Sequence, residues 1–275
     1  MEFAEFSASL QCRVIVVCGI FWRFDGLFCR AVEKRFLLEI SVETAEGAAA
    51  AERGGAGRIE LCGNLEAGGV TPGAEVMRRV REMVRIAVFA MIRPRAGDFV
   101  YSDTEFAEMK REIVVAKEFS MDGVVLGILA RDRRVDVERT QELVDFARPL
   151  PVTFHRAFDE LADLREALDD VIRTGAKRIL TSGGKNSALE GTAVLAELVQ
   201  AVGERIVILP GAGISAANIV EVAQRTRARE FHSGLSSVLP YSSQDYARFE
   251  SAVRNLSNEL NRAAKSSASG DSSGT

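Results

Sequence analysis

The sequence predicts an α/β protein whose single domain is a (β/α)8 TIM barrel, a parallel eight-stranded barrel surrounded by helices. Eight short apolar runs alternate with segments of helical periodicity over about 225 residues, which matches such a barrel in repeat number and length. The main alternative is an open doubly wound sheet. It is disfavoured because residues 38–44 lead directly into a helix, without the G-x-G-x-x-G loop that binds a dinucleotide.

The eight apolar runs are the predicted strands, and a helical segment follows each of them. In chain order the strands are Leu37–Val42, Arg58–Leu61, Ala87–Ile92, Gly123–Leu126, Val152–His155, Arg178–Thr181, Ile206–Leu209 and Arg229–His232. Helical periodicity is clearest in Ala45–Arg53, Thr104–Phe119, Val137–Phe146 and Leu161–Arg173. Residues that mark helix ends are Gly54, Gly55 and Gly175 as C-caps, and Thr71-Pro72 and Ser215 as helix starts.

The barrel is predicted to occupy residues 36–264, with an extension before it and a tail after it. Residues 1–35 read as a poorly ordered N-terminal extension, or as the product of an upstream start codon. Their longest apolar stretch, Val14–Trp22, is about half the roughly 20 residues that a membrane span requires, and it lacks the flanks of a signal peptide. Residues 265–275 are rich in serine and glycine and are expected to be disordered.

Composition and charge restrict the kind of partner. Of the 275 residues 47% are hydrophobic, which suffices for one large core. The formal net charge is −4 and the basic residues form no stripe, so neither a nucleic acid nor a membrane is an expected partner. The cysteines are Cys12, Cys18, Cys29 and Cys62, with no C-x-x-C pair. This spacing argues against disulfides and structural zinc, and it fits a cytoplasmic location.

Polar side chains gather near the predicted carboxyl ends of the strands, where barrel enzymes keep their catalytic groups. Period-two alternation places Glu39 with Ser41 on the first strand and Glu60 with Cys62 on the second. The residues predicted to share this rim are Glu39, Ser41, Glu60, Cys62, Arg93, Thr153, His155, Thr181, Glu230 and His232. Both histidines of the chain are among them, each on the last residue of a predicted strand.

We interpret this rim as a ligand site, because two glutamates, two histidines and an arginine are costly to bury unless they are paired or used. The candidate catalytic acid–base groups are Glu39, Glu60, His155 and His232, since a histidine changes charge near neutral pH. Arg93 and Arg156 are candidate groups for holding the anionic part of a substrate. The alternative is a set of barrel-capping residues that satisfy one another.

Three glycine-rich loops follow the sixth, seventh and eighth strands. In barrel enzymes the loops after strands seven and eight often hold a phosphate on backbone N–H groups. We therefore expect a small anionic ligand to bind here, although glycines also serve simple tight turns. The candidate binding residues in these loops are Thr181, Ser182, Gly183, Gly211, Gly213, Ser233 and Gly234.

The loop after the third strand, residues 93–102, is long for a connection between a strand and a helix. One interpretation is a lid over the rim. The other is a surface loop held in place by pairs of arginine and aspartate. Both stay open at this point.

Several motifs resemble the CutC copper homeostasis family across nearly the whole barrel segment. The longest are V-T-F-H-R-A-F-D at residues 152–159 and I-R-P-R-A-G-D-F at 92–99. Shorter ones are R-I-E-L-C at 58–62, G-G-V-T-P at 68–72, Y-S-D at 101–103, I-L-T-S-G at 179–183 and A-L-E-G at 188–191. The resemblance implies a cytoplasmic TIM barrel that takes part in copper homeostasis, binds copper ions and forms a homo-oligomer.

The sequence departs from the family pattern at Ser41, where members commonly carry a cysteine that faces the one at Cys62. Cu(I) prefers thiolate and thioether ligands, and a hydroxyl is a poor replacement. What remains is Cys62, with Met91 as a second soft ligand; the alternative for Cys62 is a small apolar filler. Two functions therefore stay open. One is copper binding, and the other is an acid–base enzyme, a lyase or isomerase, that acts on a small phosphorylated or carboxylated metabolite.

Overall fold

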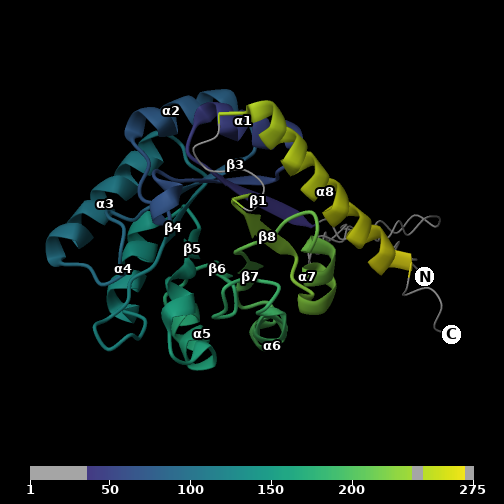
Figure 1. Ribbon diagram of the computed structural model, residues 1–275. Coiled ribbons are helices and arrows are strands. Elements are labelled where there is room, and N and C mark those ends of the chain that lie inside the picture. The colour runs from purple at the N-terminus through teal and green to yellow at the C-terminus, as the bar shows by residue number, and fades with distance from the viewer. Residues whose placement is uncertain (1–35, 237–243, 270–275) are drawn as a thin grey trace, which may run out of the picture.

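Eight parallel strands form a nearly closed barrel, and the connecting helices lie around its outside (Figure 1). The computed structural model describes residues 36–236 and 244–269. The eight parallel strands and their connecting helices confirm the predicted TIM barrel. The predicted N-terminal extension, residues 1–35, lies outside the described residues.

The strands agree with the predicted ones to within one residue at each end. They pair in the order β7-β6-β5-β4-β3-β2-β1-β8, and β7 lies beside β8 without a hydrogen-bonded ladder in the described part of the chain. The register places Glu39 of β1 opposite Arg58 of β2 and His232 of β8. The strands are β1 Leu37–Val42, β2 Arg58–Leu61, β3 Ala87–Met91, β4 Gly123–Leu126, β5 Val152–Phe154, β6 Arg178–Thr181, β7 Val207–Pro210 and β8 Glu230–Ser233.

Eight α-helices follow the strands, with two short 3₁₀ helices between them. Gly55 ends the first helix at φ 98°, and Gly175 follows the fifth at φ 85°, so both predicted caps have the left-handed backbone that glycine favours. The helices are α1 Ala45–Gly54, α2 Ala74–Met83, α3 Asp103–Glu118, α4 Val137–Ala147, α5 Leu164–Arg173, α6 Thr192–Val202, α7 Ile219–Thr226 and α8 Tyr246–Ser269, with η1 Leu65–Ala67 and η2 Arg156–Glu160.

Three predicted helix starts are wrong. Thr71 does not cap α2, whose N-cap is Gly73, because its hydroxyl donates to Glu112 Oε2 at 2.7 Å and accepts from the Arg93 N–H. Ser215 precedes an extra turn, so that α7 begins only after Asn218. The predicted helix 161–173 begins instead at Leu164, because the Asp163 side chain accepts from the backbone N–H groups that open α5.

α8 packs against α1 and joins the end of the described chain to its beginning (Figure 1). Arg53 Nε donates to Glu250 Oε2 at 2.8 Å, and Gly54 lies so close to Val253 that a Cβ on the glycine would sit 2.6 Å from the valine Cβ. The helix extends to Ser269, and so into the segment 265–275 that was predicted as a disordered tail. Extending a helix that packing has already nucleated costs little. The remaining tail residues lie outside the described ranges.

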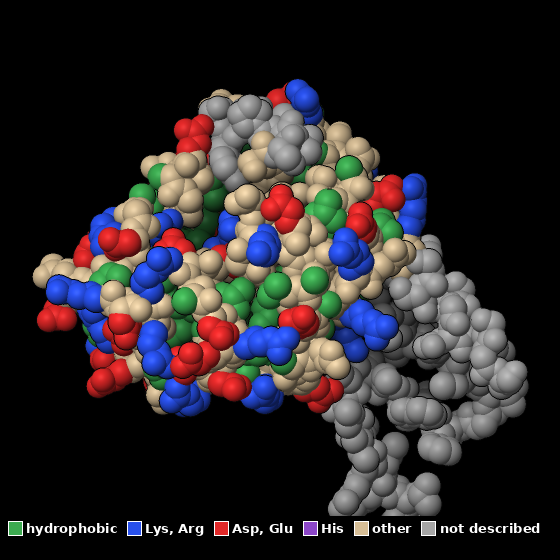
Figure 2. All heavy atoms as spheres, turned by 60° about the horizontal axis from the view of Figure 1, so that its bottom comes forward, with side chains coloured by type: hydrophobic (Ala, Val, Ile, Leu, Met, Phe, Trp, Pro, Cys, Tyr) green, Lys and Arg blue, Asp and Glu red, His purple; other side chains and the backbone are tan. Residues whose placement is uncertain are grey.

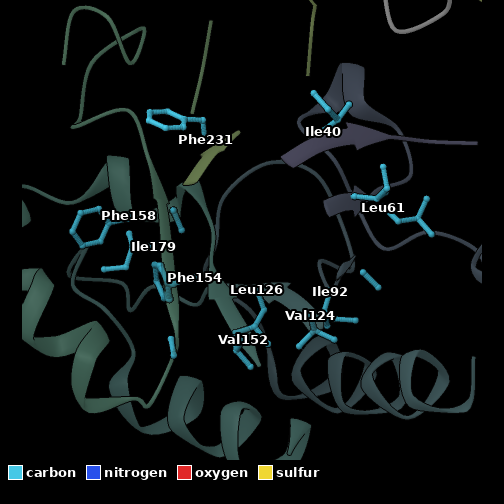
Figure 3. Close-up of a cluster of buried hydrophobic side chains, with 14 of the residues drawn as sticks. Ile40, Leu61, Ile92, Val124, Leu126, Val152, Phe154, Phe158, Ile179 and Phe231 are labelled. Carbon is cyan, nitrogen blue, oxygen red and sulfur yellow. The ribbon is translucent and has the colours of Figure 1, made fainter. Parts of the chain in front are cut away.

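Alternate residues of each strand face the helices or the barrel interior. Those that face the helices form the main core, which includes Ile40, Val124, Phe154 and Phe231 (Figure 3). Residues of the opposite parity, Cys62, Phe89, Met91 and Val125, form a separate and smaller cluster inside the barrel. The interior also holds buried polar side chains, among them Glu39, Glu60 and Arg58.

The outer surface carries charges of both signs. On the face in Figure 2, acidic and basic side chains are interspersed rather than gathered by sign, and many pair, such as Arg78 with Glu82 on α2. Among residues 36–236 and 244–269, no helix combines the length and the apolar character that a membrane span requires.

Candidate functional site

A cavity of about 260 Å³ lies among the carboxyl ends of the strands, at the rim that the sequence predicted. Eight of the predicted rim and loop residues line it: Ser41, Glu60, Arg93, His155, Arg156, Gly213, His232 and Gly234. Phe99 from the loop after β3 also lines it, and the sequence analysis gave that residue no role.

Other predicted site residues do not line the cavity: Glu39, Cys62, Thr181, Ser182, Gly183, Gly211 and Ser233. Some of them build its walls. Ser233 Oγ donates to the Ile214 carbonyl at 2.6 Å and joins the loops after β7 and β8. Gly211 allows close packing, because a Cβ there would sit 2.5 Å from Leu180 Cδ1.

Glu39 belongs to an ion-pair network that fills the barrel beneath the cavity. Its carboxylate accepts from Arg58 Nε, and Arg58 Nη2 also donates to Glu230 Oε2 at 2.7 Å. Arg178 Nε donates to the same Glu230 oxygen at 2.8 Å. Burial alone would raise the pKa of Glu39, but Arg58 and His232 together hold it at about 2. Glu39 is thus a permanent anion and not a proton carrier.

The two arginines of this network, Arg58 and Arg178, had no role predicted from the sequence. Both stand at the first position of a strand, and period-two alternation places Arg58 on the same face as Glu60. The Phe89 ring lies between them, at 5.0 Å from the Arg58 guanidinium and 5.4 Å from that of Arg178. Strand parity could therefore have found Arg58, whereas the convergence of both arginines on one ring depends on the closed barrel.

His232 links Glu39 to the cavity. Its Nδ1 lies 2.8 Å from Glu39 Oε1, and its Nε2 lies 3.7 Å from Glu60 Oε2. Burial opposes a charge on the ring, yet the carboxylates of Glu60 and Glu39 raise the pKa of His232 above its ordinary value. Burial also raises the pKa of Glu60, whose Oε1 has no hydrogen-bond partner among the described residues.

These three side chains are also the group best placed to hold a metal ion. One ligand atom each from Glu39, Glu60 and His232 lie within 4.8 Å of one another. Two carboxylates and an imidazole suit a hard or borderline divalent ion rather than Cu(I). However, Arg58 already neutralises Glu39 from below, so an ion here would have to compete with a buried guanidinium.

His155 has a different environment from His232. Its Nδ1 accepts from the Ala157 N–H at 3.2 Å, so the neutral ring carries its proton on Nε2. That nitrogen is buried and has no partner in the described part of the chain. Burial, with the Arg93 charge added, lowers the pKa of His155 to about 3. A neutral His155 ring therefore offers an Nε2–H donor, and its role as a general acid or base stays a prediction.

Arg93 connects the loop after β2 to the loop after β3 through hydrogen bonds to backbone carbonyl groups. Its Nη1 donates to the Gly68 and Gly69 carbonyls at 3.1 and 2.9 Å, and its Nη2 donates to the Gly97 carbonyl at 2.7 Å. Its guanidinium also stacks on the Phe99 ring, 4.6 Å from the centroid. Its Nε is buried without a partner among the described residues, so the anion-binding role of Arg93 stays a prediction that rests on this one nitrogen.

The loop 93–102 is tied down in the way that one of its two interpretations described. Arg95 Nη2 donates to Asp98 Oδ1 at 2.9 Å, and Arg95 Nε donates to Glu105 Oε1 at 2.5 Å. The side chains of Phe99 and Tyr101, which belong to this loop, are buried. The Phe99 ring packs on the His155 ring with their centroids 4.7 Å apart, so the loop closes one side of the cavity.

The glycine-rich loop after β6 already holds an anion, which is the chain's own Asp159. This carboxylate accepts from Thr181 Oγ1 at 2.5 Å and from the N–H groups of Ser182 and Gly184 at 3.0 Å. Asp159 thus occupies donors of Thr181 and Ser182, and the binding role of Thr181, Ser182 and Gly183 stays a prediction. Asp159 also accepts from Arg156 Nε at 2.9 Å and so fixes the position of Arg156 at the cavity.

Cys62 lies against the wall of the cavity, next to Glu60. It is fully buried, and its Sγ donates to Glu60 Oε2 at 3.5 Å. Burial and the Glu60 carboxylate raise the pKa of the thiol well above its ordinary value. Met91 shares its apolar cluster, and both side chains approach Gly69. The nearest soft ligands for a metal are thus one protonated thiol and one thioether.

Comparison with known proteins agrees with this fold. The model of the CutC family matches residues 36–237, which is most of the chain. This chain belongs to the CutC family. The copper homeostasis protein CutC homologues of mouse and human are 48% and 46% identical to it over 202 residues, 74% of either chain in each case.

The solved structures divide into a CutC relative and more distant barrels. CutC from Streptococcus agalactiae is 33% identical, with a TM-score of 0.69 over 72% of this chain and 98% of that one. A thiamine phosphate pyrophosphorylase from Pyrococcus furiosus has a TM-score of 0.56 at 18% identity, which shows a shared barrel fold and nothing more.

Proposed function

We propose that this CutC-family chain takes part in copper homeostasis and binds copper ions at the cavity, with copper as its cargo. The support is the family itself, whose mouse and human members are named for copper homeostasis. We propose a cytoplasmic location with it, because a reducing compartment keeps a thiol ligand free. A homo-oligomer is part of the same proposal, and sedimentation of the purified chain tests it.

The soft donors at and beside the cavity fit Cu(I) only in part. Cys62 and Met91 supply one thiol and one thioether from adjacent strands, and both are soft ligands. Ser41 lines the cavity one strand away, where a hydroxyl adds little for Cu(I). Binding must also remove the proton of Cys62, whose pKa is raised. We therefore expect Cu(I) affinity to be modest and to increase with pH.

The test is a Cu(I) titration of the full chain against a competing chelator. Cys12, Cys18 and Cys29 are first changed to serine, so that Cys62 is the one thiol left. We expect one copper per chain, weaker binding in Met91→Leu and none in Cys62→Ala. Ser41→Cys should bind more tightly, whereas Ser251→Cys, a matched thiol on the exposed side of α8, should not. No copper uptake, or uptake unchanged in Cys62→Ala, would refute the proposal.

A second candidate function is an acid–base enzyme that acts on a small phosphorylated or carboxylated metabolite. One observation favours it: Glu60 and His155 both line the cavity, and each has a buried polar atom without a partner among the described residues. Buried groups of this kind usually have a purpose, such as a ligand that satisfies them. Arg156 supplies a cation at the same cavity.

Calorimetric titration of chelator-treated protein with dihydroxyacetone phosphate and with pyruvate tests this second candidate. Binding of either probe should weaken at least about tenfold in Arg156→Gln, which loses a charge-assisted hydrogen bond. Arg205→Gln is the control, because Arg205 pairs with Asp169 on the exposed surface. Absence of binding by both probes, or equal loss in both variants, counts against an anion site.

A further inference from the structure

We propose that the cavity is a proton-transfer site for small carbonyl compounds that carry a carboxylate or phosphate group. In this site His155 Nε2–H donates a hydrogen bond to the carbonyl oxygen, and His232 takes the proton from the neighbouring carbon. Arg156 binds the anionic group. This inference rests on the second candidate function and specifies its reaction.

The hydrogen bond at Nδ1 determines what His155 can do. Because Nδ1 accepts from the Ala157 N–H, the ring cannot accept a proton from a substrate at that atom, and Nε2 is left as a donor. Nε2 is buried without a partner in the described chain, so an oxygen placed there would satisfy it. A neutral imidazole donor fits an oxygen that gains negative charge during the reaction.

The position of His155 is built into the fold. A Cβ at Gly127, just after β4, would sit 2.7 Å from both Cε1 and Nδ1 of the ring. The ring is therefore packed against the backbone on one side and against Phe99 on the other. His155 lines the cavity together with Phe99 of the loop 93–102.

His232 is held in the opposite way, with its reactive nitrogen left available. Glu39 fixes Nδ1 at 2.8 Å, and the ring itself lines the cavity, so Nε2 is the nitrogen left for a ligand. Nε2 makes no hydrogen bond within the described chain, and at 3.7 Å Glu60 is a neighbour rather than a partner. His232 is 8% exposed, compared with 0% for Glu39, so the cavity side of this pair is the imidazole.

The anion has one clear cationic site. Arg93 uses both Nη atoms to hold carbonyl groups and keeps only a buried Nε without a partner in the described chain, and the loop after β6 is filled by Asp159. Arg156 keeps 45% of its side chain exposed while Asp159 anchors its Nε, which leaves Nη1 for a ligand. A carboxylate and a phosphate both suit a guanidinium, and the size of the cavity limits the ligand to a small molecule.

The chemical step needs no additional reagent. His232 Nε2 takes a proton from the carbon next to the carbonyl, and the C–H electron pair becomes a C=C bond. The C=O pair moves onto the oxygen, which forms an enolate that accepts from His155 Nε2–H. The proton on His232 exchanges with solvent, and return of a solvent-derived proton to the same carbon gives hydrogen exchange.

Proton exchange in D₂O tests the proposal directly. The full chain is incubated with pyruvate or dihydroxyacetone phosphate, and NMR follows the loss of the protons next to the carbonyl. His155→Leu should slow the exchange by about 10²- to 10³-fold, the usual effect of losing an oxyanion donor. His155→Gln keeps an N–H donor and should recover part of the rate. Arg156→Gln should act mainly on KM, and Arg205→Gln should change nothing.

The outcomes separate this inference from the function on which it rests. If a probe binds but wild-type protein does not accelerate its exchange, the proton-transfer role is overturned and the anion site stands. If neither probe binds, the anion site fails as well. A ¹⁵N spectrum of the two histidines needs no variant at all: an Nδ1–H tautomer or a charged ring for His155 at pH 7 would overturn the assignment.

Discussion

At the scale of single residues, the two histidines show how neighbours decide the chemistry of identical side chains. His232 on β8 faces Glu39 on β1 and Glu60 on β2. Burial and the charge of Arg58 lower its pKa, but these two carboxylates raise the pKa by more. His155 after β5 faces the Arg93 cation and the Phe99 and Phe154 rings, and both burial and the Arg93 charge disfavour a charged ring. One imidazole is therefore easily protonated and the other hardly at all.

We predict that an NMR titration separates the two rings without ambiguity, because the chain has no other histidine. His155 should stay neutral, with its proton on Nε2, down to about pH 4, since its pKa lies at about 3. His232 should titrate above the ordinary value of 6.5. Glu39→Gln should lower the pKa of His232 by removing one of the two carboxylates that stabilise its charge, and should leave His155 unchanged. Similar titration of both rings would contradict these environments.

Strand parity predicted the residues that line the rim, but not what each of them does. Glu60, His155 and His232 could be placed because period two and the strand ends are readable from sequence. Asp159 could not, because its carboxylate reaches a loop more than 20 residues away that folds around it. The hydrogen bonds from Arg93 to backbone carbonyl groups could not be predicted either, because every residue has a carbonyl group and the sequence pattern does not show which ones will be accepted as partners.

At the scale of elements, the fit of α8 on α1 depends on the absence of a side chain at Gly54. A Cβ there would sit 2.6 Å from Val253 Cβ and 2.9 Å from the Glu250 carbonyl oxygen. We predict that Gly54→Ala destabilises the protein by about 1–3 kcal/mol through overpacking. The intrinsic helix preference of alanine, up to about 1 kcal/mol, works in the other direction. Chemical denaturation monitored by circular dichroism gives the free energy of unfolding.

Gly57→Ala is the matched control for this prediction. Its added Cβ would lie 3.4 Å or more from its nearest neighbours, so we expect a change within about 0.5 kcal/mol. Equal effects of the two substitutions would mean that the approach of the helices is not what Gly54 permits. The contact between α8 and α1 could not be predicted from the sequence, because the two helices meet across about 200 positions.

At the scale of the whole molecule, several buried charges make stability depend on pH. The folded pKa of Glu39 is about 2, below its ordinary 4.5, so the stability it contributes is present above pH 4.5 and is lost as pH falls towards 2. The folded pKa of His155 is about 3, below its ordinary 6.5. The stability that the neutral ring contributes is therefore lost at higher pH than that of Glu39, as pH falls from 6.5 towards 3. Acid should therefore weaken the barrel in two overlapping stages.

Glu112 on α3 has the opposite effect on stability, which it lowers as pH rises. Burial raises its pKa to about 7, against the hydrogen bond from Thr71. Its contribution is full below pH 4.5 and is lost as pH rises through 7. Glu112→Gln should therefore gain stability relative to wild type between pH 4.5 and 7, with a constant difference below pH 4.5.

His155→Gln provides the complementary measurement, with the free energy of unfolding compared with wild type at each pH. Below pH 6.5 His155 binds a proton in the unfolded wild-type chain but stays neutral in the folded one. The free energy of unfolding of the wild type should therefore fall relative to that of the variant as pH falls. This relative fall approaches about 1.4 kcal/mol per pH unit and ends near pH 3. Above pH 6.5 the difference should be constant. A difference independent of pH in both variants would mean that neither group is held in the folded protein as described, and the acid sensitivity of the barrel would then have to come from elsewhere.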